Sequence, residues 1–301
     1  MEPAVSYAER SAGRLKYGFV APALVLLIGM NVFPLCYNIV LSFTNAELSG
    51  GAWTFVGFDH YSRVFSDPRY AAAMRTTALF TTLAVTIELA LGFALALSLQ
   101  RTFRGKSAIL TLLLIPMMLS PAVMGLYWNL ILNGQYGILN QTLGALGLVQ
   151  PQWLTDPALK LLSVLLVDVW MWTPFMALIA LAGLQAIPVY LYEAAEIDRA
   201  SVWRVFRRIT LPLCAPLLFL AVLFRATDAL KQFDLVMAIT GPNDAATQTL
   251  SALLYQVMLR DYKIGLGSAY AFVVLVPVVA LATVFIRYVD AMQRRQGRGA
   301  T

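Results

Sequence analysis

The chain alternates between long apolar segments and short polar ones. Each apolar segment reaches the roughly 20 residues that a helix needs to cross the hydrocarbon core of a bilayer. The segments are continuously apolar and lack the ten-residue alternation of outer-membrane barrel strands, so helices are favoured. We predict an all-α integral membrane protein with six transmembrane helices, at about residues 17–43, 71–99, 107–132, 158–184, 213–239 and 264–289. Pro116 and Pro121 predict a kink within the third of these helices.

Lysine and arginine are unevenly distributed between alternate polar segments. They are concentrated before the first apolar segment, at 101–106, at 199–208 and after the last apolar segment. Positive charge is retained on the cytoplasmic side of membrane proteins. We therefore predict that both termini are cytoplasmic, with tails at 1–16 and 291–301 that flank a single membrane domain at 17–290.

Composition excludes an ordinary soluble protein. The 301 residues are 59% hydrophobic and 13% charged, whereas soluble domains are roughly 25% charged. The net charge of +6 follows from the topology and favours anionic lipid, and no basic and aromatic cluster indicates nucleic-acid binding. His60 is the only histidine and has no cysteine nearby, so we predict no metal site and interpret His60 as a solvated loop residue.

Residues 193–212 form a basic amphipathic stretch between the fourth and fifth apolar segments. We expect a short helix, a turn and a surface helix that ends at Leu211-Pro212, because proline disfavours helix in the residue before it. Ordering a loop costs entropy, so an organised polar loop indicates a surface that binds a soluble partner. Anionic lipid would satisfy the arginines of this stretch, but it would not select the acids at its other end, Glu193, Glu196 and Asp198.

The fifth apolar segment carries a charged residue at every third position, namely Arg225, Asp228, Lys231 and Asp234. On one helix this spacing places alternating charges along a slowly winding stripe. Two interpretations remain open. The stripe is either a polar wall of a translocation path or a self-neutralising ladder of salt bridges that holds the helix against its neighbours.

Two acids, Glu88 and Asp168, occur alone in the second and fourth apolar segments. An acid at membrane depth is by default a functional candidate that faces the protein interior. Asp168 is followed by Trp172, and a carboxylate beside an aromatic face suits the binding of a sugar ring. The alternative is that Asp168 pairs with Arg225 or Lys231 and that the tryptophan packs against lipid or protein.

The 193–212 stretch also carries a recognisable motif. Glu193-Ala194-Ala195 is followed by Asp198 and Ala200, and then by I-T-L-P at 209–212. This pattern resembles the signature E-A-A-x-x-D-G-A and I-x-L-P of the inner-membrane permeases of binding-protein-dependent ABC importers, in the maltose-type branch for sugars and polyols. Further similarity lies in the stretches FVGFDHY, GILNQTLG and KQFDLVMAITGP. Arg199 replaces the expected glycine, which implies either a helix-compatible backbone or strain at this position.

The resemblance implies a type I ABC importer permease fold and a multi-pass location in the cytoplasmic (inner) membrane of a bacterium or archaeon. It implies that the loop at 186–212 is a coupling loop seated in a cleft of a separate ATPase, where Glu193 pairs with a basic residue. The residues that carry this expected coupling role are Glu193, Ala194, Ala195, Asp198, Arg199, Ala200, Phe206, Leu211 and Pro212.

The resemblance also implies partners. These are a cytoplasmic ATP-binding cassette ATPase dimer, a second permease subunit of different sequence or a second copy of this chain, an extracytoplasmic solute-binding protein and the lipid bilayer. The chain has no G-x-x-x-x-G-K-[ST] loop, so we do not expect it to be an enzyme by itself. We expect it to bind no cofactor, with ATP and magnesium held by the partner ATPase.

We predict a permease subunit that moves a carbohydrate or polyol by alternating access. Which sugar or polyol it moves does not follow from the sequence. The candidate residues of the path are Asp168, Trp172, Arg225, Asp228, Lys231 and Asp234. The alternative is a secondary transporter driven by an ion gradient, which inverted repeats would support, although none is evident. A non-transporting membrane scaffold would not need charges near the middle of the bilayer.

Overall fold

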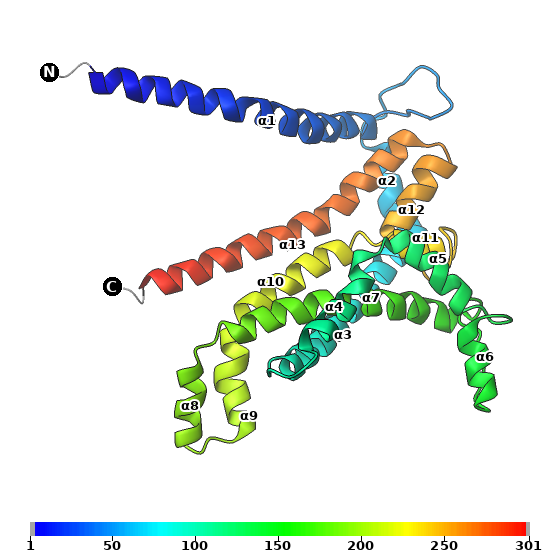
Figure 1. Ribbon diagram of the computed structural model, residues 1–301. Coiled ribbons are helices and arrows are strands. Elements are labelled where there is room, and N and C mark those ends of the chain that lie inside the picture. The colour runs from blue at the N-terminus through cyan, green and yellow to red at the C-terminus, as the bar shows by residue number, and fades with distance from the viewer. Residues whose placement is uncertain (1–3, 299–301) are drawn as a thin grey trace. The chain divides into compact units, whose positions relative to one another are not determined.

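The computed structural model describes residues 4–298, with side chains for 20–288. Across these residues the secondary structure is helical, apart from one isolated antiparallel bridge between Thr44 and Phe55 (Figure 1). The predicted all-α class is therefore confirmed. The chain divides into two compact units, Met1–Phe65 with Val257–Val273, and Ser66–Gln256 with Val274–Thr301.

Five helices are long and apolar enough to cross a membrane, and the bent pair α4 and α5 gives a sixth if it forms one span. Helices thus occur at all six predicted positions, while the number of crossings and the side of each terminus stay predictions. The five are Val20–Ser42 within α1 (Ala4–Ser42), α3 (Pro68–Leu99), α7 (Pro157–Gln185), Val202–Ala229, and Ile264–Tyr288 within α13 (Ile264–Arg298). α1 covers most of the predicted tail at 1–16, and residues 1–3 and 299–301 lie outside the described part of the chain.

The third predicted span is broken in the middle. α4 (Lys106–Met118) and α5 (Pro121–Ile131) meet at an angle of 96°. Leu119 and Ser120 between them adopt extended conformations, which agrees with the steric restriction that Pro121 imposes on the residue before it. Pro121 then occupies the first turn of α5, where its missing N–H is not needed. The predicted kink is confirmed.

The prediction of one helix over 213–239 is wrong. α10 (Leu211–Ala229) ends early, and α11 (Asp234–Ile239) begins after a break. Polar side chains satisfy the backbone at this break. Thr249 Oγ1 donates to the Gln232 carbonyl at 2.8 Å, and the Gln232 side-chain oxygen accepts from the Phe233 N–H at 3.0 Å. Irregular backbone in apolar surroundings is tolerated only where such partners exist.

α3 and α7 each begin with an N-cap aspartate that is followed by a proline. The Asp67 carboxylate accepts from the Arg69 N–H at 2.8 Å, and the Asp156 carboxylate accepts from the Ala158 N–H at 2.9 Å. Aspartate at the N-cap and proline in the first turn both favour helix initiation. They start α3 three residues and α7 one residue before the predicted starts at 71 and 158.

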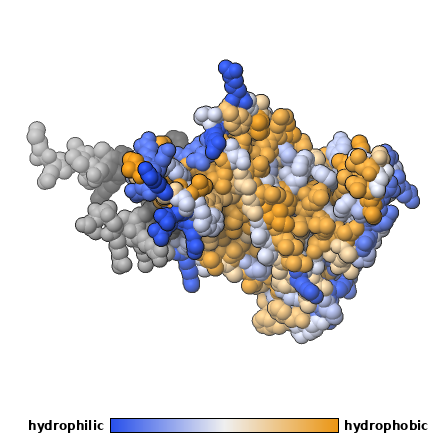
Figure 2. Space-filling model, turned by 90° about the horizontal axis from the view of Figure 1, so that it is seen from below, coloured by the Kyte–Doolittle hydropathy of each residue, from blue (hydrophilic) through white to orange (hydrophobic). Residues whose placement is uncertain are grey.

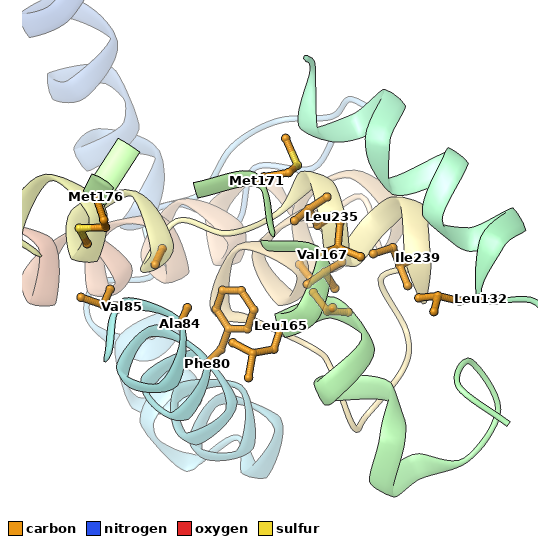
Figure 3. Close-up of a cluster of buried hydrophobic side chains, with 14 of the residues drawn as sticks. Phe80, Ala84, Val85, Leu132, Leu165, Val167, Met171, Met176, Leu235 and Ile239 are labelled. Atoms are coloured by element: carbon orange, nitrogen blue, oxygen red, sulfur yellow. The ribbon is translucent and has the colours of Figure 1, made fainter. Parts of the chain in front are cut away.

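α3 and α7 pack closely along their lengths. A Cβ atom added to Gly92 of α3 would lie 2.5 Å from Met176 Cβ of α7. Small residues at such contacts let transmembrane helices approach, and dispersion then stabilises the pair. The main buried cluster joins Phe80, Ala84 and Val85 of α3 to Leu165, Val167, Met171 and Met176 of α7, with Leu132, Leu235 and Ile239 (Figure 3).

Short helices occupy the connections, namely α2 (Asp59–Ser66), α6 (Ile138–Ala145), α12 (Leu250–Tyr255) and the π-helical η2 (Gln256–Arg260). In the first unit, His60 of α2 is buried, with Nε2 2.8 Å from the Thr44 carbonyl oxygen. The interpretation of His60 as a solvated residue is therefore wrong, because the loop folds over it. A Cβ on Gly265 would come within 3.1 Å of the same His60 nitrogen.

Apolar side chains cover much of the face seen in Figure 2. Large exposed hydrophobic residues include Val25, Met30 and Phe33 of α1 and Val276 and Ile286 of α13. Extensive apolar surface on long helices is expected where lipid is the solvent.

Candidate functional site

The 186–212 loop folds as a pair of short helices. α8 (Val189–Ile197) and α9 (Val202–Val205) lie side by side, and the π-helical segment η1 (Phe206–Thr210) leads into α10 (Figure 1). The Tyr192 and Thr210 hydroxyls are 3.2 Å apart and hold the pair together. Phe206 stacks on Trp203, with ring centroids 5.4 Å apart, and also contacts Phe93 of α3 at 6.0 Å. The predicted helix, turn and second helix are confirmed.

Arg199 sits at the turn in a left-handed conformation, with φ of +49°. Its N–H donates to the Glu196 carbonyl at 2.9 Å, and the Ala200 N–H donates to the Ala195 carbonyl at 2.9 Å. This pair of bonds is the Schellman motif, in which the left-handed position usually holds glycine. The sequence allowed either a helix-compatible or a strained backbone at Arg199, and the structure shows the strained backbone.

The second helix does not end at Leu211-Pro212, so this part of the prediction is wrong. Leu211 has helical dihedral angles, and its N–H bonds to the Phe206 carbonyl across a π-helical turn. Helix continues through Pro212 from Val202 to Ala229. A π-helical turn is a common local adjustment in a helix, and here it immediately precedes the proline that lacks an N–H.

The loop presents apolar and charged side chains together. Ile197 is 83%, Val202 86% and Trp203 67% exposed around the turn. The acids Glu193, Glu196 and Asp198 and the bases Arg199, Arg204, Arg207 and Arg208 form no ion pair within the described part of the chain. Of the other signature residues, Ala194 and Pro212 are exposed, and Ala195 is buried. Exposed apolar residues ringed by free charges are typical of a protein-binding surface.

A second site forms around Arg225 of α10, whose side chain is 1% exposed. Its guanidinium pairs with Glu88 of α3, with Nε 2.9 Å from Oε2 and Nη2 3.1 Å from Oε1. Nη2 also pairs with Asp168 of α7, and Nη1 lies 3.4 Å from Asp228. The guanidinium carbon lies 5.0 Å from the centre of the Trp172 ring. Buried charges need such paired geometry.

Asp168 therefore pairs with Arg225, as the alternative interpretation held. Its side chain is fully buried, and its second carboxylate oxygen accepts from Gln232 Nε2 at 2.8 Å. Glu88, which the sequence leaves alone in its segment, is equally buried. Gln232 was missed, and its only sequence signal is an amide in an apolar segment. Through Glu88, Asp168 and Arg225 the cluster ties α3, α7 and α10 together.

The predicted stripe of charges does not exist on one helix, because α10 ends at Ala229. Arg225 and Asp228 are the one pair of the four that contact each other among the described residues. Lys231 follows the helix and is exposed, and Asp234 is exposed in the first turn of α11, where an acid is favourable. The four charges therefore do not share one helix, and their role in a translocation path stays a prediction.

A cavity of about 650 Å³ lies beside this cluster. Trp172, Phe175 and Ile179 of α7 line it, together with residues of α10, Lys231, and Ala282 and Phe285 of α13. Arg225, Asp228 and Lys231 supply its charged lining, whereas Asp168 and Asp234 do not reach it. Aromatic walls with a few polar groups are the usual composition of a small-molecule site. The described residues contain no group of three or more His, Cys, Asp or Glu able to hold a metal.

Comparison with protein families matches residues 88–298 to the family described as binding-protein-dependent transport system inner membrane component. A probable ABC transporter permease protein of Sinorhizobium fredii is 35% identical over 272 residues, 89% of this chain and 87% of that protein. The trehalose/maltose transport system permease protein MalF of Thermococcus litoralis is 34% identical over 276 residues, 91% of this chain and 93% of that protein.

A solved structure has a similar fold. A chain of the bacterial alginate ABC transporter, crystallised in complex with an alginate pentasaccharide-bound periplasmic protein, superimposes with a TM-score of 0.82. The match covers 96% of this chain and 97% of that chain at 20% sequence identity, so it establishes the fold and no more.

Proposed function

Since the chain belongs to the family of binding-protein-dependent transport system inner membrane components, we propose that it is the permease subunit of an ATP-driven importer for a carbohydrate or polyol. Membership makes it a multi-pass protein of the inner membrane and a transport component. The relative named for trehalose and maltose supports the carbohydrate class. Solute would cross by alternating access, in which the path opens to one side of the membrane at a time.

The observation that carries the proposal is the exposed two-helix loop at 186–212. Ile197, Val202 and Trp203 offer an apolar surface at the turn, and the acids and bases beside it have no partner among the described residues. We assign this surface to the ATPase, with Glu193 pairing with a basic residue and Ala194 permitting close approach. Phe206, Leu211 and Pro212 support the second helix at its junction with the span.

Continuity of the second helix gives a route for coupling. Residues Val202–Ala229 form 28 helical residues, or about 42 Å at a rise of ~1.5 Å per residue. One end carries the exposed turn, and the other carries Arg225 and Asp228 at the cavity. A displacement of the loop by the ATPase would therefore move a wall of the cavity as one rigid element.

The remaining partners follow from the same proposal. An ATPase dimer would hold ATP and magnesium and carry out the hydrolysis, and we expect this chain to bind no cofactor of its own. A second permease, either different in sequence or another copy of this chain, would complete the path. A solute-binding protein would deliver the solute from outside.

Within the path we assign solute contact to Trp172, Asp228 and Lys231, which line the cavity. Arg225, Asp168 and Glu88 instead hold three helices in register, because their charged groups are buried and paired with one another. Asp234 does not line the cavity, so we do not assign it to the path.

Transport into proteoliposomes tests the proposal. The chain is reconstituted with its ATPase, second permease and solute-binding protein, and uptake of labelled trehalose and maltose is measured. We expect uptake that requires both ATP and the added solute-binding protein. Uptake driven by a proton gradient alone would instead favour the secondary transporter, and absence of any transport would favour a scaffold.

Glu193→Ala tests the coupling assignment within the same preparation. We expect weaker ATPase association and lower solute-stimulated hydrolysis, while Glu47→Ala, an exposed acid outside the loop, leaves both unchanged. If Glu193→Ala behaves like the control, the role assigned to Glu193 is wrong.

A further inference from the structure

The positive charge of Arg225 is not available to a solute, although the residue lines the cavity. Nε and Nη2 are engaged by Glu88 and Asp168, and Nη1 faces Asp228. The aromatic ring of Trp172 covers the guanidinium at 5.0 Å. With its side chain 1% exposed and its guanidinium paired with acids, Arg225 does not offer a donor to an anion in the cavity.

Asp228 is the opposite case. Its side chain is 53% exposed, and its one contact among the described residues is the 3.4 Å approach of its Oδ2 to Arg225. The carboxylate therefore retains capacity to accept hydrogen bonds from a ligand in the cavity. Lys231 is exposed and forms no ion pair within the described part of the chain, so its ammonium can donate.

The accessible charges of the cavity thus balance, one acid against one base. Behind them the wall carries more carboxyl groups than cations, because the buried Glu88 and Asp168 supply two carboxyl groups to the single guanidinium of Arg225. An anionic group next to Lys231 would also face Asp228, and the two like charges would repel each other. A hydroxyl group meets no such conflict, since it can donate to Asp228 and accept from Lys231.

We propose that this cavity accepts an uncharged polyhydroxylated solute and rejects anionic ones, with Asp228 as the residue that determines this specificity. Solute hydroxyls donate to the Asp228 carboxylate, Lys231 donates to another solute oxygen, and the apolar face of the solute lies against Trp172 and its aromatic neighbours. This inference rests on the proposed function and adds the charge class of the solute.

The test uses a matched pair of probes, trehalose and trehalose 6-phosphate, with maltose as a second neutral probe. Binding to the purified assembled complex in nanodiscs is measured by equilibrium dialysis without the solute-binding protein, so that selectivity of that protein does not enter. We expect the neutral sugars to bind at least about ten-fold more tightly than the phosphate, the scale of one hydrogen bond to a charged group. Equal or tighter binding of the phosphate, or no binding of either neutral sugar, overturns the inference.

Variants test which residue causes the discrimination between the neutral sugars and the phosphate. Asp228→Asn should weaken binding of the neutral sugars and narrow the discrimination against the phosphate, and Lys231→Gln should leave the discrimination intact. The matched control is Asp234→Asn, an exposed acid outside the cavity, which should change neither. If the phosphate binds the wild-type cavity more tightly than the neutral sugars and Lys231→Gln abolishes that binding, the cavity is an anion site and the inference fails.

Two failures can be told apart. A complex that transports no sugar with ATP contradicts the proposed function itself. A complex that transports sugar but discriminates equally well with Asp228→Asn contradicts this inference alone. Thermal unfolding of each variant confirms that the fold is retained.

Discussion

Arg225 and Glu88 lie 137 positions apart in the sequence and form a two-point ion pair between α10 and α3. Both side chains are buried, and Asp168 of α7 completes the cluster. A buried ion pair adds little net stability over an apolar substitute, yet removal of one member leaves a charge without a partner in a medium of low dielectric constant. The pair is therefore a strong constraint on how the three helices can pack.

Arg225→Met is the first prediction. Methionine is unbranched, apolar and shorter than arginine, and it leaves Glu88 and Asp168 without their cation. We therefore expect a loss of about 3–5 kcal/mol in the free energy of unfolding. Denaturant titration in detergent micelles measures the change. Asp228→Asn, which alters a half-exposed member of the same cluster, should stay within about 1 kcal/mol of the wild type. Equal midpoints for Arg225→Met and the wild type would contradict the role of the cluster.

Gly92→Ala is the second prediction. The added Cβ would lie 2.5 Å from Met176 Cβ and 2.8 Å from the backbone nitrogen of Ala177, so α3 and α7 would have to separate. We expect destabilisation of about 1–3 kcal/mol, the usual cost of overpacking.

Gly183→Ala is the matched control, because its Cβ would meet Cys214 Sγ at an ordinary 3.5 Å. Alanine has the higher helix propensity, so this variant should be neutral or up to about 1 kcal/mol more stable. The same titration measures both variants. A loss in Gly183→Ala as large as that in Gly92→Ala would show that the close approach is not the cause.

Arg199→Gly is the third prediction. The left-handed conformation costs a residue with a Cβ about 1–2 kcal/mol, and glycine removes this cost. We expect slower hydrogen exchange of the Arg199 and Ala200 amide positions by about five-fold, since both amides donate in the turn. Hydrogen–deuterium exchange with mass spectrometry measures the effect. Arg199→Ala, which removes the same charge but keeps the Cβ, should show no slowing, and equal slowing in both variants would refute the strain.

Local signals in the sequence were enough to predict most helices. Asp67-Pro68 and Asp156-Pro157 set the starts of α3 and α7, and the apolar lengths set their extent. The extended residue before Pro121 broke the third segment as expected. The two-helix loop was also predictable, because its polar residues follow a helical pattern.

Tertiary contacts decided the features that the sequence did not reveal. Nothing between Leu230 and Phe233 resembles a helix terminus, and α10 ends there because Thr249 and the Gln232 side chain satisfy the exposed backbone. The sequence shows that Arg225 and Asp168 are charged and allows them to pair. Whether they do pair depends on how the helices pack. At Arg199 the sequence allowed either a helix-compatible or a strained backbone. The hydrogen bonds that terminate α8 require the strained, left-handed conformation.

Site-directed crosslinking tests the central claim most directly, namely that an ATPase binds the 186–212 loop. Cys36 and Cys214 are first replaced by alanine, and a cysteine is placed at Val202. The control is a cysteine at Val149, an exposed residue between the third and fourth predicted spans, where cytoplasmic termini place the chain outside the membrane. The account predicts that Val202→Cys crosslinks to the ATPase in a manner that depends on nucleotide, and that Val149→Cys does not. Labelling of Val202→Cys from outside intact cells by a membrane-impermeant maleimide, with no crosslink to any ATPase, would contradict it.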